Sequence, residues 1–204
     1  SHREAQLLAG PVTAPTAAAP VPPSDRSAFS IPPGIRYLNC AYMAPLHRSV
    51  EAAGIEGVLR KRRPWEIEAR HFFEESDTVR GLFARLIGST EPRRVALMPA
   101  ASYGLSVAAR NSGLRRGSIV VLTEGQFPGN VYPWRRAAAE AGASVRMVAP
   151  PEGPGRGRAW NERILEAIGP ATGAVSLGAV HWTDVARFDL EAIGARAREV
   201  GAAF

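Results

Sequence analysis

Two loops in the sequence combine residue types that could bind a flat, anionic ligand. In "PAASYG" (99–104), small residues and the Ser102 hydroxyl stand at the expected start of a helix, where backbone N–H groups attract anions. In "TEGQFPGNVYPW" (123–134), Phe127 precedes a Pro-Gly turn and could lie over a flat ring. Each feature also has an ordinary explanation, because Ser often caps a helix and an aromatic residue often belongs to the core or to a lid.

A third loop, "HWTDVARFD" (181–189), is unusually rich in polar and aromatic groups. It begins with four such residues in a row: His181, Trp182, Thr183 and Asp184. A binding site would explain this density. A turn capped by Thr183 or Asp184, with Trp182 packed on the domain edge, would explain it equally well.

The elements around these loops follow from the spacing of apolar residues. Apolar residues three and four apart predict helices over 46–62 and 65–87. Beyond Pro92, strands are expected at 94–98, 118–122, 144–148 and 173–180, and helices at 102–111, 131–141, 161–168 and 190–200.

Continuous apolar strands separated by helices of about ten residues indicate β-α-β units. The predicted fold class is α/β, a three-layer sandwich with a mostly parallel sheet. Ligands of such sheets bind at the carboxyl ends of the strands. The loops to search are therefore 99–104, 123–130, 149–160 and 180–188.

The basic residues exclude several functions. The net charge is +6, yet of twenty-five basic residues only Lys61 is a lysine. Lys61 does not follow a G-x-x-x-x-G pattern, which excludes a Walker-type phosphate loop. Apart from Arg60–Arg63 the arginines are scattered among acidic residues, so we expect no nucleic-acid partner.

The remaining composition excludes other classes of site. A single cysteine, Cys40, cannot form an intrachain disulfide, and the four histidines lack the paired spacing of a metal site. The glycines of "GPGRGR" (153–158) have the wrong spacing for a dinucleotide fingerprint. The sequence contains no run of eighteen apolar residues, so it predicts no membrane-spanning helix.

The two ends of the sequence suggest a fragment with two parts. Residues 1–33 are expected to be a flexible Ala/Pro-rich arm or a degraded twin-arginine export signal, and residues 34–204 the domain. The expected location is the cytoplasm, or outside it if the signal is real. The sequence starts without Met, and at Phe204 it stops where a buried strand should begin.

Four blocks of the sequence resemble successive blocks of one enzyme family. They are "YLNCAYMAPLHRSVEAAGIEGV", "VALMPAASYGLSVAA", "EGQFPGNVYPW" and "GAVHWTDVARFDLEAIGARAREVGA". In this order they are similar to class V aminotransferase-like, pyridoxal-phosphate-dependent enzymes of fold type I, such as cysteine desulfurases, kynureninase and isopenicillin N epimerase-like proteins. The resemblance covers about residues 35–204 and implies the N-terminal part of the large domain.

The resemblance implies pyridoxal phosphate as cofactor and a role for eight residues. Ala101 and Ser102 correspond to phosphate-binding positions, and Phe127 to the residue that stacks on the pyridine ring. Trp182 and Thr183 correspond to the ring edge. The substrate side corresponds to Tyr37, Asn39 and Ala41.

Three features depart from the family pattern. Ala100 and Ala101 stand where relatives often carry hydroxyl groups, and Val185 stands where they tend to have glycine. The aspartate that pairs with the pyridine nitrogen, and the lysine that forms the Schiff base, are expected beyond Phe204. Lys61 lies outside all the loops named above and cannot replace that lysine.

The resulting prediction is the N-terminal portion of an enzyme that acts on an amino-acid-like substrate, as a homodimer when full length. The reaction type stays open among desulfuration, transamination, epimerisation and side-chain cleavage. The 204-residue chain alone is expected to be inactive. The alternative is a non-catalytic protein that keeps the fold for binding or as a scaffold.

Overall fold

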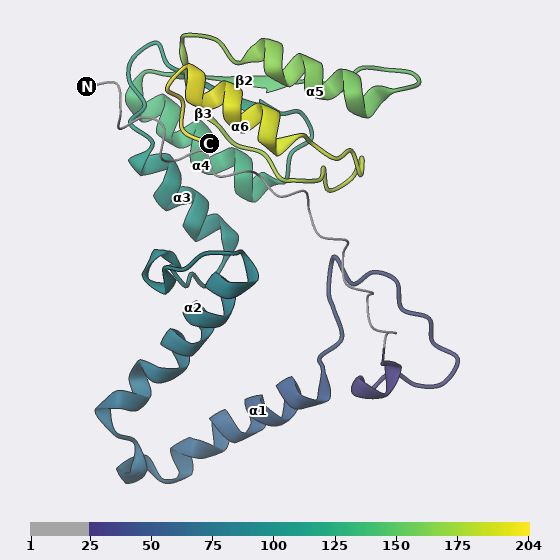
Figure 1. Ribbon diagram of the computed structural model, residues 1–204, viewed down its shortest axis with the longest axis vertical. Helices are drawn as coiled ribbons and strands as arrows, with labels where there is room; N and C mark the ends of the chain where they lie inside the picture. The colour runs from purple at the N-terminus through teal and green to yellow at the C-terminus, as the bar shows by residue number, and fades with distance from the viewer. Residues whose placement is uncertain (1–24) are drawn as a thin grey trace, which may run out of the picture. The chain divides into compact units, whose positions relative to one another are not determined.

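The computed structural model describes residues 25–204 and divides into two units, residues 1–78 and 79–204 (Figure 1). The proposed export signal lies outside the described residues. Of the predicted arm, residues 25–33 are described, and they bond to the start of the first long helix. Arg48 Nε donates to the Ser27 carbonyl at 3.0 Å, and the rings of Phe29 and His47 meet edge to face.

The first unit is helical, and its described part, residues 25–78, contains no buried core. Its elements are η1 (Arg26–Ala28), α1 (Arg48–Leu59), η2 (Arg60–Arg62), η3 (Pro64–Glu66), η4 (Ala69–Phe72) and the start of α2 (Glu74–Leu86). None of the residues 25–78 is buried. The prediction of one helix over 65–87 is wrong for the residues before Glu74. His71 Nδ1 accepts from the Glu68 backbone N–H, and this bond starts a separate 3-10 turn at residues 69–72.

The second unit contains a parallel sheet of three strands in the order β2-β1-β3. The strands are β1 (Ile119–Thr123), β2 (Ser144–Val148) and β3 (Thr172–Val175). The helices are the rest of α2 (residues 79–86), α3 (Ala101–Asn111), α4 (Pro128–Ala141), α5 (Arg156–Ala167) and α6 (Leu190–Glu199), besides the turn η5 (Pro92–Arg94). Ala203 forms a parallel bridge with Ala174, so a further strand position begins beside β3.

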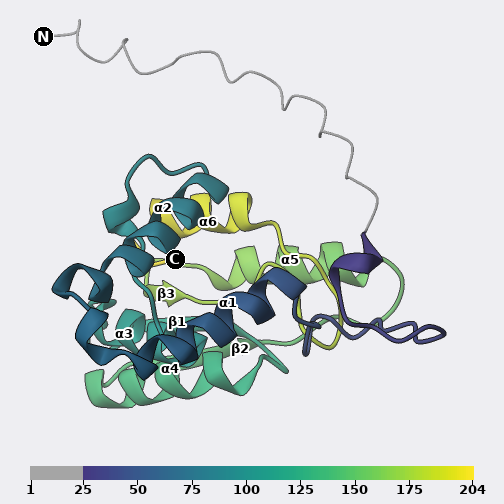
Figure 2. The same ribbon diagram turned by 90° about the horizontal axis from the view of Figure 1, so that it is seen from below.

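Alternate residues of β1 point into two separate cores. Val120 and Leu122 pack with Trp134 of α4 on one face. Val121 packs with Trp160 of α5 and with α6 on the other face. Helices therefore cover the sheet on both sides (Figure 2), which confirms the predicted three-layer α/β fold.

Some sequence predictions in this unit were wrong in detail. The strand predicted over 173–180 already ends at Val175, as β3. Residues 95–98 are not part of the sheet, because no strand among the described residues pairs with them. Helix α5 starts at Arg156 and not at residue 161 as predicted, because Gly155 takes a left-handed φ of 75° and turns the chain into the helix. Within residues 25–204 no helix has the length and hydropathy of a membrane span.

Candidate functional site

The carboxyl ends of β1 and β3 form the edge where a ligand is expected. These strands are neighbours, yet the chain leaves β1 for α4 on one face and leaves β3 for α6 on the other. Where successive connections leave for opposite faces, the loops separate and leave a crevice. Loops 124–127 and 176–185 border it.

The loop after β1 holds Phe127 at the start of α4. The Gln126 side chain accepts from the Phe127 backbone N–H at 2.9 Å and donates to the buried Thr123 hydroxyl at 3.2 Å. Phe127 is thereby fixed as the N-cap residue of α4, while its ring stays 56% exposed. An exposed ring on a fixed backbone is available to a ligand.

The first turn of α3 lies beside the same ring. A Cβ placed on Gly129 would be 3.5 Å from Phe127 Cδ1 and 3.7 Å from Ser102 Cβ, so the three residues converge. The N-cap is Ala100, which offers no side-chain bond, and Ala101 and Ser102 follow as the first helical residues. The first N–H groups of a helix lack partners within it, so this end of α3 can bind an anion.

The interpretation of Ser102 as an ordinary helix cap is therefore wrong, because Ala100 occupies the cap position. Within residues 25–204 the Ser102 hydroxyl has no hydrogen-bond partner, whereas the Ser106 hydroxyl donates to the Ser102 carbonyl at 2.7 Å.

The loop after β3 brings Trp182 to Phe127. The two rings meet edge to face, with centroids 5.4 Å apart and planes at 87°. Trp182 Nε1 donates to the Gly125 carbonyl at 2.7 Å, and 58% of the side chain is exposed. Thr183 Oγ1 lies 3.3 Å from His181 Nδ1. The structure thus brings together three of the residues predicted to bind the cofactor, Ser102, Phe127 and Trp182, with Ala101 and Thr183 next to them in the chain.

The end of this loop contains an ion pair and a strained residue. Arg156 of α5 lies 2.6 Å from the half-buried Asp184 carboxylate. Val185 has a φ of 62°, in the left-handed region that a β-branched residue rarely takes. Glycine adopts this conformation freely. This is a physical reason for the glycine that the resemblance led us to expect where this chain has Val185.

Sequence reasoning missed two polar residues that support the site, Gln126 and Asn130, and it named His181 without giving it a role. Gln126 orients Phe127, and His181 bonds to both loops. Asn130 Oδ1 accepts from Ser176 Oγ at 2.7 Å and from Trp134 Nε1 at 3.2 Å, and so joins α4 to the end of β3. Gln126 and His181 lie in the loops that follow β1 and β3, which was the available signal, whereas Asn130 lies in the first turn of α4.

The substrate-side residues belong to the first unit. Tyr37, Asn39 and Ala41 lie in an exposed loop before α1, where the Asn39 carbonyl accepts from the backbone N–H groups of Tyr42 and Met43. Their role remains a prediction.

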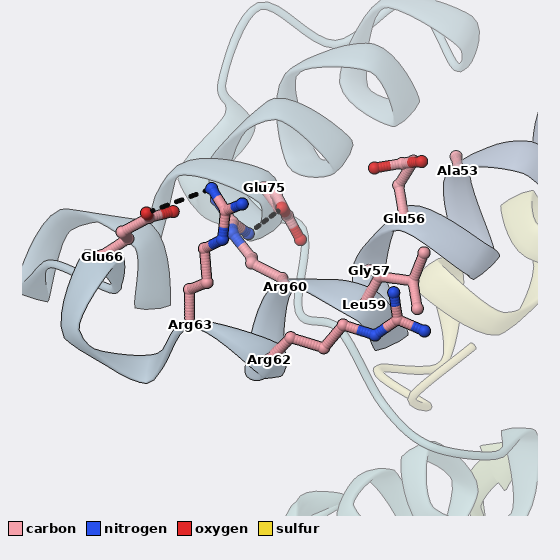
Figure 3. Close-up of a pocket in the computed structure, with 9 residues that line it drawn as sticks. All are labelled: Ala53, Glu56, Gly57, Leu59, Arg60, Arg62, Arg63, Glu66 and Glu75. Carbon is pink, nitrogen blue, oxygen red and sulfur yellow. Dashed lines mark hydrogen bonds and ion pairs between the residues drawn. The ribbon is translucent and has the colours of Figure 1, made fainter.

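An open groove of about 630 Å³ lies in the first unit (Figure 3). Three arginines and three glutamates line it, and two arginines are already paired, Arg60 with Glu75 at 2.7 Å and Arg63 with Glu66 at 3.5 Å. Because its charges balance, the groove has no net attraction for an anion. Groups of three or more metal-ligating side chains are absent from residues 25–204.

Comparisons with solved structures agree with this fold. A variant of C-DES with glycine covalently linked to its PLP cofactor is 20% identical, with a TM-score of 0.71 over 86% of this chain and 46% of that one. The cysteine desulfurase CsdA from Escherichia coli is 17% identical, with a TM-score of 0.63 over 87% of this chain and 46% of that one. This chain thus spans less than half the length of these structures.

Comparisons at the level of sequence give the family. No curated protein matches the chain. The model of the family described as aminotransferase class-V matches residues 63–204, well over half of the chain. This agrees with the predicted cofactor, since class V aminotransferases depend on pyridoxal phosphate. The chain therefore belongs to the class V aminotransferase family.

Proposed function

We propose that this chain forms the cofactor-binding part of a pyridoxal-phosphate enzyme that acts on an amino-acid-like substrate. The observation that carries the proposal is the convergence of the α3 N-terminus, Phe127 and Trp182 at the crevice between β1 and β3. An anion site beside an exposed aromatic ring suits a planar molecule with a phosphate group.

The phosphate would bind at the first turn of α3. Ala101 and Ser102 offer backbone N–H groups at the positive end of the helix, and Ser102 adds a hydroxyl that lacks a partner within residues 25–204. Ala100 contributes no side-chain bond there. The backbone of α3 therefore has to supply most of the binding.

The ring would lie against Phe127. Gly129 leaves the space beside Phe127 and Ser102 open, and a side chain at that position would fill it. Trp182 and the Thr183 hydroxyl would border the ring edge. When bound, pyridoxal phosphate withdraws electrons from the substrate, while these residues orient it and exclude water on their side.

Tyr37, Asn39 and Ala41 are proposed for the substrate side, and the full-length protein is proposed to be a homodimer in the cytoplasm. The reaction remains open among desulfuration, transamination, epimerisation and side-chain cleavage.

Residues 1–204 alone are proposed to be inactive. Lys61, the single lysine of the sequence, is exposed in the turn η2 of the first unit. It does not belong to any loop of the crevice. The second candidate is a non-catalytic protein that keeps the fold for binding or as a scaffold.

Titration of the full-length apo-protein with pyridoxal phosphate tests the proposal. We expect saturable binding and the visible absorption band of a lysine-bound cofactor. Binding without this band would favour the scaffold. Absence of binding would refute the proposed site.

A further inference from the structure

His181 is a buried titratable side chain with a partner at each ring nitrogen. It is 4% exposed, and its ring packs on Trp160 with centroids 4.9 Å apart. Nε2 lies 3.1 Å from the Glu124 carbonyl oxygen, and Nδ1 lies 3.2 Å from the Asp184 backbone nitrogen. Glu124 and Asp184 belong to the two loops that border the crevice. One imidazole therefore joins both loops.

The two backbone partners determine where the ring proton lies. The Asp184 amide can only donate, so Nδ1 must offer its lone pair. The Glu124 carbonyl can only accept, so Nε2 must carry the proton. His181 is thus a neutral imidazole in the Nε2–H form.

A second hydrogen bond joins the same loops, from Trp182 Nε1 to the Gly125 carbonyl at 2.7 Å. Gly125 has a φ of 69°, and a Cβ there would lie 3.5 Å from His181 Cε1, so the loop passes close over the imidazole. These two connections set the distance between the loops. They therefore also set the edge-to-face geometry of Phe127 and Trp182.

We infer that His181 is a positioning residue of the cofactor site, which acts by holding the Phe127 loop and the Trp182 loop at a fixed separation. This inference rests on the proposed function. His181 itself lies beneath the loops, against Trp160 and Phe188, and acts through the backbone at Glu124 and Asp184. Neutral charge and one specific tautomer are part of this role.

Three substitutions in the full-length protein separate the two hydrogen bonds. His181→Leu removes both hydrogen bonds and fills the same space with an apolar side chain. His181→Asn places an amide oxygen near Nδ1 and can keep the Asp184 bond. His181→Gln places an amide N–H near Nε2 and can keep the Glu124 bond.

Phe188→Leu is the matched control. Phe188 packs on Trp160 with ring centroids 5.1 Å apart and lies 6.5 Å from His181, but its side chain bonds to neither loop. It should lose core packing without loosening the crevice.

Pyridoxal phosphate affinity is measured by titration, and stability by thermal melting of the apo-protein. We expect His181→Leu to weaken binding about tenfold, as for loss of hydrogen bonds that hold a site. His181→Asn and His181→Gln should each restore part of the affinity. Phe188→Leu should lower Tm but leave the affinity unchanged.

Nitrogen-15 NMR of the His181 ring gives a readout that does not depend on the cofactor. We expect a neutral ring with its proton on Nε2. A proton on Nδ1, or wild-type affinity in His181→Leu, would overturn the inference while leaving the proposed function intact. If His181→Leu does not fold, wild-type affinity in both the Asn and Gln variants would overturn it. A wild-type protein that does not bind pyridoxal phosphate would instead refute the proposed function.

Discussion

Replacing Phe127 with alanine tests the ring site directly. The side chain is 56% exposed, so somewhat less than half of its surface is buried. Full burial of Phe contributes about 1.5–3 kcal/mol, so the lost burial costs about 0.7–1.3 kcal/mol. Loss of the edge-to-face contact with Trp182 adds about 0.5–1.5 kcal/mol. The free energy of unfolding of the apo-protein should therefore fall by about 1–3 kcal/mol.

Cofactor binding should weaken in addition. A lost ring-on-ring contact of about 0.5–1.5 kcal/mol corresponds to a dissociation constant raised about two- to tenfold. The assay is titration of full-length apo-protein with pyridoxal phosphate, followed by tryptophan fluorescence. Tyr132→Ala is the control, because Tyr132 is another exposed aromatic residue on α4. If Phe127→Ala loses stability as calculated but binds with wild-type affinity, Phe127 does not stack on the cofactor.

Ser102→Ala should weaken cofactor binding by about 1–3 kcal/mol without changing the Tm of the apo-protein, because Ser102 is not the cap of α3. Ser106→Ala is its control, and a lower apo Tm with unchanged affinity would contradict the expectation. Val185→Gly should raise the free energy of unfolding by up to about 1.5 kcal/mol, since it relieves about 1–2 kcal/mol of left-handed strain at an entropic cost of about 0.5–1 kcal/mol. Chemical denaturation measures it, and a loss of stability would refute the strain argument. Residues 1–204 expressed alone should aggregate and show no visible cofactor band, because α1 and α2 expose large side chains such as Val58 and Leu86. Size exclusion and melting check this, and a monodisperse protein with a sharp melt would contradict it.

The sheet was largely predictable from the sequence. Strands β1 and β2 lie within one residue of their predicted ranges, because a short, continuous apolar run between two helices is typical of a buried strand. Residues 94–98 have a similar apolar run, but a strand also needs a hydrogen-bonded neighbour. The sequence pattern does not contain that information.

The positions of the site loops were predictable, but their contacts were not. Phe127 and Trp182 follow strands, and parallel strands bring such loops to one edge. The role of His181 depends on Glu124, which is 57 residues away in the chain. Residue type also misled at Ser102, because Ala100 takes the cap position that a serine usually fills.

The central place of β1 in the sheet has a consequence for synthesis of the chain. β1 pairs with β2 at residue 144 and with β3 at residue 172, so the first strand made must wait for both partners. At a translation rate of about 5–20 residues per second, that wait is about 3–10 s. During this time at least one edge of β1 lacks a paired strand. The strand also exposes three side chains that are fully buried in the finished fold, Val120, Val121 and Leu122. We therefore expect this strand to be accessible to chaperones until residue 175 has left the ribosome.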